Sequence, residues 1–331
     1  MFALTSQFEI GKYRFRGCNA CRVEKSVHQI DHRATITVPA SATLVSPKYS
    51  IELPSKQTAK QFAVGDKVKI RLGYNGELKD EFTGFVSRID IGRPVVIECE
   101  GMSWLLRKKK NIKKTWESTT LKDVLTYLID GLDGITLHPD IPDMPLENLA
   151  IDNASGTQVI EYLKGLTNGA LTAYFTDSGE LYMGLTYADT AKVTVRHRLG
   201  WNTIGEGSLK QHRAEDTEVK VEVVYKDEGG STVTTEAGKA GGIVRKEKLG
   251  GITDAASIKA IAEAKLAQES FDGMEGTLET FLIPYCTPGM RQELSDPRYP
   301  EREGIYFVEK TVTDFGQSGG RRSIDIGLRL S

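Results

Sequence analysis

The stretch VGDKVKIRLGYNGELKDEFTGFV, residues 64–86, carries the strongest structural signal in the sequence. Val68, Ile70 and Leu72 alternate with lysine and arginine, so an extended chain would place the apolar side chains on one face and the charges on the other. Asn75-Gly76 readily takes positive φ at both central positions of a two-residue turn. The stretch therefore predicts an antiparallel β-hairpin with one buried face.

The same period of two extends outward from this hairpin. Residues 34–38 and 95–99 alternate in the same way, which predicts at least four strands and a small barrel or sandwich in about eighty residues. Alternation returns at 219–225 and again in three segments near the end of the chain. A second β region is therefore expected after residue 187.

Helical periodicity separates these β regions. Thr120 and Ser155 are expected to cap two helices, of which the second covers about 156–167, and a hairpin at 171–184 follows. A glycine-rich segment at 238–251 precedes an alanine-rich helix at 254–269. The later β region is therefore expected to be interrupted by an insertion with a helix of its own.

These patterns predict an α+β, β-dominated multidomain chain. A first β-barrel domain is expected at 1–115 and an α/β domain at 116–187. A discontinuous second β-barrel domain is expected at 188–237 and 276–331, with a glycine-rich and helical insertion at 238–275. The fold class is thus two antiparallel β-barrels with α/β insert domains.

Composition narrows the classes of function. The chain has 331 residues, with 43 basic and 45 acidic side chains, so its net charge of -2 creates no overall field for nucleic acid or an anionic membrane. No window is apolar enough for a membrane-spanning segment. Four scattered cysteines in a chain of this length predict reduced thiols and no disulfide framework.

No catalytic, cofactor or metal site is predicted from the motifs. Cys18, Cys21, His28 and His32 have the order of a zinc motif, but the six-residue linker reads as strand and is too short for a zinc finger. G-x-S-x-G and Walker-type loops are missing, and a lone G-x-G at 205–207 has no capped helix behind it. Two converging carboxylates in a cleft stay open as a generic alternative, as in glycoside hydrolysis.

The sharpest charge feature is a basic run immediately after the first β region. It comprises Arg107, Lys108, Lys109, Lys110, Lys113 and Lys114. Apart from the flanking Trp104 and Trp116, it has no aromatic residues for base stacking. We interpret the run as a solvated, interface or lumen patch, with nucleic-acid contact as the alternative.

Several short motifs resemble the baseplate-hub proteins of phage tails. VGDKVKI (64–70), FTGFV (82–86) and VIECEG (96–101), followed by an apolar pair and lysines, are similar to the first barrel of these hubs. A helix opened by Thr120-Leu121, the hairpin DSGELY (177–182), and PGM (288–290) with GIYFV (304–308) follow in the order of the hub's later domains. The resemblance is to the Mu-like, late control D type, whose domains are shared with VgrG of type VI secretion.

The resemblance implies an assembly role and no enzymatic activity. Hubs of this type are homotrimers whose paired barrels form a near-sixfold ring between a sixfold tail tube and a threefold spike. The implied partners are the tube protein, a central spike protein and other baseplate subunits, with DNA or the tape measure passing through the lumen. The implied location is the virion tail baseplate of a phage or prophage contractile tail, assembled in the host cytoplasm. The sequence ends at Ser331 without the needle of VgrG, so a separate spike subunit is expected.

Two rival functions stay open from sequence. A tail-associated peptidoglycan hydrolase would require converging acids or a metal. A nucleic-acid-contacting tail component would depend on the basic run and would bind with steep salt dependence.

Overall fold

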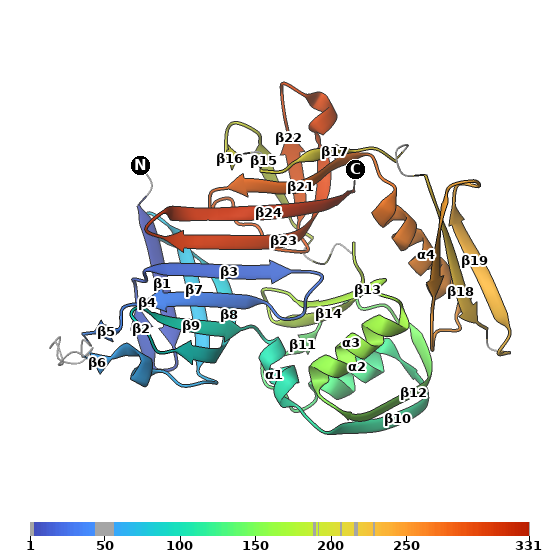
Figure 1. Cartoon of the computed structure of the whole chain (residues 1–331), viewed down its shortest axis with the longest axis horizontal. Helices are drawn as coiled ribbons and strands as arrows, with labels where there is room; N and C mark the ends of the chain where they lie inside the picture. The colour runs from blue at the N-terminus through green and yellow to red at the C-terminus, as the bar shows by residue number, and fades with distance from the viewer. Residues whose placement is uncertain are drawn as a thin grey trace.

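The computed structural model describes residues 3–43, 56–187, 190, 192–205, 207–214, 218–227 and 229–330 (Figure 1). Strands dominate, and most of them belong to one 14-stranded sheet in which nearly all neighbours are antiparallel. The α+β, β-dominated fold class is thereby confirmed. Within the described residues, no helix is both long and apolar enough to cross a membrane.

Seven strands from the first hundred residues form one half of the main sheet. They are β1 (Leu4–Ile10), β2 (Tyr13–Phe15), β3 (Ala20–Ser26), β4 (Arg33–Val38), β7 (Lys67–Tyr74), β8 (Glu77–Asp90) and β9 (Val95–Glu100). Beside them lie the short strands β5 (Ser41–Ala42) and β6 (Lys56–Gln57) and the 3-10 turn η1 (Thr58–Gln61). One apolar cluster, built around Phe8, Ile36 and Ile97, fills this half.

The predicted hairpin at the centre of this half is confirmed. Strands β7 and β8 pair antiparallel, and Val68, Ile70 and Leu72 are all buried. The turn residues Asn75 and Gly76 have φ values of 53° and 90°. A dipeptide that tolerates positive φ at both positions therefore sets the register of the hairpin.

Gly84 on β8 has a steric role. A Cβ atom at this position would lie 2.2 Å from the backbone oxygen of Glu100, in neighbouring β9. Only a residue without a side chain allows the two backbones to approach so closely. The glycine of the FTGFV motif is therefore required by packing.

Gly84→Ala is expected to destabilise the chain by about 1–3 kcal/mol, because the added methyl group must displace backbone. The measurement is the free energy of unfolding in urea. Gly17→Ala is the control, since a Cβ there meets nothing within 4 Å. Equal stability of the two variants would contradict the steric role of Gly84.

Seven later strands form the other half of the main sheet. They are β15 (Thr194–Arg198), β16 (Thr203–Gly205), β17 (Lys210–His212), β21 (Gly273–Thr280), β22 (Arg291–Ser295), β23 (Gly304–Gly316) and β24 (Gly319–Arg329). The 3-10 turn η3 (Pro300–Arg302) lies between β22 and β23. A separate apolar cluster, which includes Leu278, Leu294 and Ile324, fills this half.

The two halves are joined edge to edge. Strand β3 pairs antiparallel with β23, from Ala20 opposite Gly316 to Ser26 opposite Lys310. The two β regions therefore share one hydrogen-bonded sheet (Figure 1). Two apolar clusters fill it, and the cluster of the first half also includes Leu282 and Phe315 from the later region. The strand order of the described residues runs from β16 to β2 and records no pairing between these ends. Closure of each half into a barrel stays a prediction.

The α/β unit lies between the two halves in the sequence. Its elements are α1 (Ser103–Lys108), β10 (Ile112–Thr120), α2 (Leu121–Ile129), β11 (Thr136–Leu137), β12 (Pro145–Ala154), α3 (Gly156–Leu166), β13 (Leu171–Phe175) and β14 (Glu180–Leu185). Both predicted caps are confirmed, since Thr120 accepts a hydrogen bond from the backbone of Asp123 and Ser155 forms a capping box with Gln158. The predicted hairpin of β13 and β14 is also present.

One expected pairing differs in the structure. We expected the strand at 219–225 to belong to the second barrel, but β18 (Val219–Lys226) pairs with β19 (Thr232–Gly238) and β20 (Ile243–Lys248) in a separate three-stranded sheet. The helix α4 (Ala255–Glu269) packs on this sheet. The alternating residues of β18 belong to the apolar core of the α/β unit, because alternation defines a buried face but not the partner that covers it.

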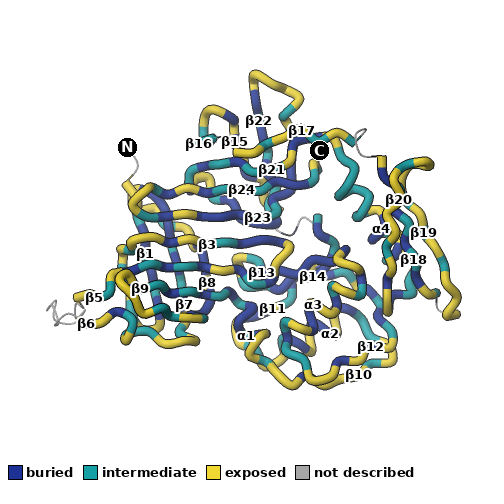
Figure 2. The backbone as a smooth tube through the Cα atoms, in the orientation of Figure 1, coloured by how far each residue is buried: buried dark blue, intermediate teal, exposed yellow. Residues whose placement is uncertain are grey.

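Burial distinguishes the interior from the edges. Figure 2 shows β13 buried along its length, whereas the outer strand β19 alternates between exposed and intermediate residues. The domain boundaries at 115/116, 187/188, 237/238 and 275/276 stay predictions.

Candidate functional site

The basic run is divided between two places. Arg107 and Lys108 end α1, and both cations lie over the ring of Trp104, at 4.8 and 4.5 Å from its centroid. Arg107 also forms an ion pair with Glu100. These two cations are therefore engaged by the first β half and by their own helix.

The remaining lysines lie near α2 and β10. The ammonium group of Lys109 donates to the backbone oxygens of Tyr127 and Asp130, at 3.1 and 2.8 Å, and so stabilises the negative C-terminal end of α2. Lys114 lies 5.9 Å from the ring centroids of both Trp116 and Tyr127. Lys113 pairs with Asp152 at 3.2 Å. The run's own lysines therefore already contact the ring faces on which a nucleic-acid base would stack.

Lys110 is exposed and lines a groove of about 1210 Å³. The groove lies between strands β3, β4, β8 and β9 and the helices α1 and α3. Its charged lining consists of Arg22, Arg33, Arg88, Arg107, Lys108 and Lys110 together with Glu24, Asp31, Glu98, Glu100 and Glu161. Because the two signs almost balance, the groove lacks the single-sign field that favours a polyanion.

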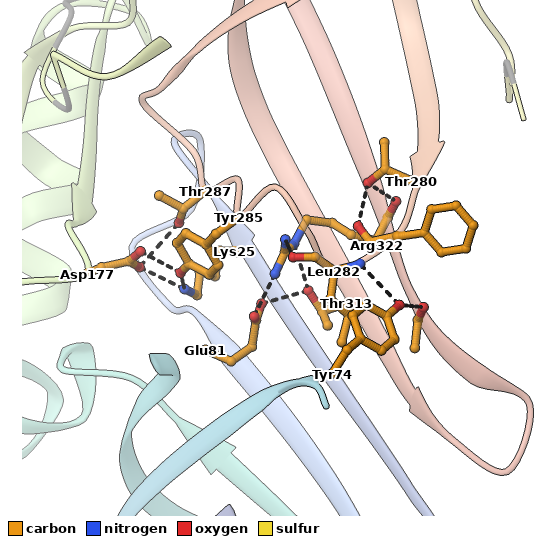
Figure 3. A network of polar contacts seen from close by, with 12 residues as sticks. Lys25, Tyr74, Glu81, Asp177, Thr280, Leu282, Tyr285, Thr287, Thr313 and Arg322 are labelled. Carbon is orange, nitrogen blue, oxygen red and sulfur yellow. Dashed lines mark hydrogen bonds and ion pairs between the residues drawn. The ribbon is translucent and has the colours of Figure 1, made fainter. Parts of the chain in front are cut away.

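A network of buried polar contacts joins the two halves of the sheet (Figure 3). Arg322 on β24 donates to Glu81 on β8 at 2.6 Å, and their side chains are 0% and 3% exposed. Thr313 donates to the other oxygen of Glu81 at 2.7 Å, and Arg322 also donates to the backbone oxygen of Leu282 at 2.9 Å. The carboxylate and the guanidinium are therefore both paired and hydrogen-bonded, as buried charges must be.

A second ion pair, between the buried Lys25 and the partly exposed Asp177, joins the α/β unit to both halves. The ammonium group of Lys25, on β3, donates to Asp177 at 2.7 Å, in the turn between β13 and β14. The hydroxyl groups of Tyr285 and Thr287, from the segment between β21 and β22, donate to the same carboxylate (Figure 3). The ring of Tyr285 also contacts Arg322, at 4.8 Å from its centroid. Tyr285 therefore links the two ion pairs.

The pKa values of the second pair keep both groups charged. Burial by itself lowers the pKa of Lys25, but the Asp177 carboxylate more than reverses this shift, and the net pKa is raised. Burial raises the pKa of Asp177, but Lys25 reverses that shift too, and the net pKa is lowered. The two charges therefore stabilise each other in a site that would disfavour either alone.

A pocket of about 370 Å³ borders this junction. Lys25, Glu81 and Asp177 line it together with His32, from the loop between β3 and β4. The polar groups that line it are largely occupied by one another, which suits a structural joint better than a reaction centre. We call the network of Figure 3 the buried junction.

The four zinc candidates do not converge. Cys21 lies in the core of the first half, where burial raises its pKa, and burial raises the pKa of Cys18 to about 11. His28 pairs with Glu309 at 3.2 Å, and the Nε2 atom of buried His32 lies 3.3 Å from the backbone oxygen of Ser26. Across the described residues, no group of three His, Cys, Asp or Glu side chains is placed to hold a metal ion.

The sequence contains a signal for the buried junction that our motif search missed. Arg322 is in phase with the buried residues Ile324 and Ile326, and Lys25 is in phase with Cys21 and Val23. A charge at an apolar position of an alternating strand predicts a buried charge that needs a partner. The partner of each of these two charges lies more than 150 residues away in the sequence.

No family model and no curated protein matches the sequence. Among solved structures, a tail protein from Neisseria meningitidis is similar with a TM-score of 0.68 at 11% identity, over 98% of this chain and 96% of that one. A 43 kDa tail protein of prophage MuSo2 from Shewanella oneidensis gives 0.63 at 10% identity, over 97% of both chains. This chain has the fold of prophage tail proteins.

The tail-protein fold also extends to a secretion system. A type VI secretion component from E. coli, described as similar to the T4 tail proteins gp27 and gp5, has a TM-score of 0.60 at 9% identity, over 98% of this chain and 79% of that one. The expected resemblance to phage tail proteins and secretion components is therefore confirmed at the level of the fold. Identities of 9–11% establish the fold alone.

Proposed function

We propose that this chain is a structural baseplate-hub subunit of a phage or prophage tail. Three copies form a ring that adapts the sixfold tail tube to the threefold spike. The observation that carries the proposal is the joined sheet, in which two halves of seven strands each meet at β3 and β23. Three chains with two halves each supply six comparable units, which is what a threefold-to-sixfold adaptor requires.

The buried junction supports this role. An adaptor must hold its two halves at a fixed angle, and Glu81 with Arg322 joins them by a buried, directional ion pair. Lys25 with Asp177 fixes the α/β unit against the same joint. Buried ionic contacts that are fully paired favour one arrangement of the parts, and we assign that function to this junction.

The same proposal includes the partners of the subunit, its location and the role of the basic run. The partners are the tube protein, a separate spike protein and other baseplate subunits, and the subunit acts in the virion tail after assembly in the host cytoplasm. The basic run from Arg107 to Lys114 serves as an interface or lumen patch, past which DNA or the tape measure moves. The role is not enzymatic, because broad surfaces and not a reaction pocket carry it.

The purified chain is expected to form a trimer of about three times its 36.5 kDa mass. Light scattering measures that mass, and negative-stain images are expected to show a ring. A chain that stays monomeric at tens of micromolar, both alone and with its tube protein, contradicts the proposal.

The two rival functions make different predictions. Peptidoglycan-lytic activity that is lost on chelation or carboxylate substitution would favour a hydrolase. DNA affinity that falls steeply with salt and disappears when Lys108, Lys109 and Lys110 are neutralised would favour a nucleic-acid-contacting component.

A further inference from the structure

The second half of the sheet presents a tryptophan to solvent. Trp201, in the turn between β15 and β16, is 80% exposed. A tryptophan side chain can bury 150–250 Å² on association, and tryptophan is strongly enriched among residues that dominate binding energy. Such a residue at the tip of a loop indicates a contact surface.

Local hydrogen bonds hold the loop that carries Trp201. The backbone nitrogen of Arg198 donates to the side chain of Asn202 at 2.7 Å, and that of Gly200 donates to the hydroxyl of Thr203 at 3.1 Å. The nitrogen of Trp201 itself donates to the oxygen of Arg198 at 3.1 Å, and Gly200 takes a positive φ of 72°. A loop fixed in this way loses little entropy when its tip binds, so the contact is preorganised.

Two arginines lie on the strand that leads into the Trp201 loop. Residues 194–205 include Arg196 and Arg198 and contain no aspartate or glutamate. Both arginines are exposed, and Arg196 pairs with Glu293 at 2.6 Å. The loop therefore fits a surface that combines apolar area with negative charge.

The same chain carries an acidic surface. Residues 130–143, DGLDGITLHPDIPD, contain four aspartates and no lysine or arginine. Asp130, Asp133, Asp140 and Asp143 are all exposed, and Pro139 is exposed among them. Asp140 pairs with Lys192 at 3.0 Å, so the other three carboxylates supply most of the negative charge. We call this segment the acidic loop.

We propose that Trp201 and its flanking arginines dock on the acidic loop of a second copy of this chain. The proposal rests on the trimeric ring of the proposed function and names a contact that closes it. Each copy gives one tryptophan loop and receives one on a different surface. Such a heterologous contact between unlike surfaces generates a closed ring when the rotation between copies is a third of a turn.

The test measures the dissociation constant of the trimer by sedimentation or mass photometry over a dilution series. Trp201→Ala is expected to raise it on the order of thirtyfold or more, as for a residue at the centre of an interface. Tyr162→Ala is the control, since Tyr162 is an exposed aromatic residue on α3. Circular dichroism and urea unfolding check that both variants keep the fold.

Charge reversal tests the partner surface. Arg198→Glu is expected to weaken the trimer, and so is Asp133→Lys with Asp143→Lys. All three changes in one chain are expected to restore part of the assembly, because the side chains at position 198 and at positions 133 and 143 then again carry opposite charges.

Three outcomes would overturn the contact. If Trp201→Ala leaves the trimer unchanged, the proposed contact is wrong and the hub proposal is unaffected. A trimer intact in Trp201→Ala that no longer binds another tail component assigns the loop to a different protein. If the wild-type chain forms no trimer, either alone or with its tube protein, both the hub proposal and the proposed contact are wrong.

Discussion

Glu81→Leu is expected to lower the free energy of unfolding by about 3–5 kcal/mol, because it leaves Arg322 buried without its counter-charge. The variant also removes the acceptor of the Thr313 hydroxyl. The loss is expected at neutral pH and in high salt alike, since a pair with almost no exposure is little screened. Urea unfolding of the purified chain measures it.

The double variant Glu81→Leu with Arg322→Met separates the ion pair from the packing. Replacing both charges with apolar groups of similar size is expected to recover much of the lost stability, although the backbone oxygen of Leu282 loses its donor. Asp80→Ala is the matched control, because Asp80 is the preceding residue on β8 and pairs with Lys69 and Arg71 at the surface. That exposed site is expected to contribute at most about 1 kcal/mol. Equal effects of Glu81→Leu and Asp80→Ala would contradict the special role of the buried pair.

Lowering the pH is expected to destabilise the chain already at pH values above the range in which carboxylates titrate. Burial and the neighbouring charge of Lys25 lower the pKa of His32 from 6.5 to about 4, against smaller opposing effects of Asp177 and Asp31. Between these two values the unfolded chain binds a proton at this residue and the folded chain does not. Stability from this group is therefore complete above pH 6.5 and is lost as the pH falls toward 4, by about 3 kcal/mol in total at 1.36 kcal/mol for each unit.

The slope of stability against pH isolates this effect. Urea unfolding at several pH values from 7.5 to 4.5 is expected to show a steep fall in the wild type and a flatter one in His32→Gln. Some slope remains in the variant, because burial also lowers the pKa of His197. A His32 resonance that titrates near pH 6.5 in the folded protein would refute the prediction.

The local elements of this fold could be predicted because their causes are local. The hairpin at 64–90 follows from its alternation and from Asn75-Gly76, and the helices α2 and α3 follow from the caps at Thr120 and Ser155. The partner of a strand is different, because it depends on distant residues. The alternation of β18 fitted a barrel as well as it fitted the small sheet under α4, and only the pairing with β20 decides between them.

The candidate site also combines features that the local sequence predicts with features that depend on distant residues. The basic run was visible as composition, but its cations turned out to contact Trp104, Tyr127 and the end of α2. The buried junction was not predicted, although Lys25 and Arg322 occupy apolar positions in their strands. Their partners, Asp177 and Glu81, lie 152 and 241 residues away in the chain, where no local pattern points to them.

The pairing of β3 with β23 also sets the order in which the chain can finish folding during synthesis. Residues 20–26 leave the ribosome long before their partners at 310–316 are made. During this interval the edge of β3 lacks its final neighbour, and an open strand edge can pair with another nascent chain. Completion of the sheet thus depends on synthesis of the hairpin of β23 and β24. A chain terminated before this hairpin would keep the edge of β3 open for pairing with other chains.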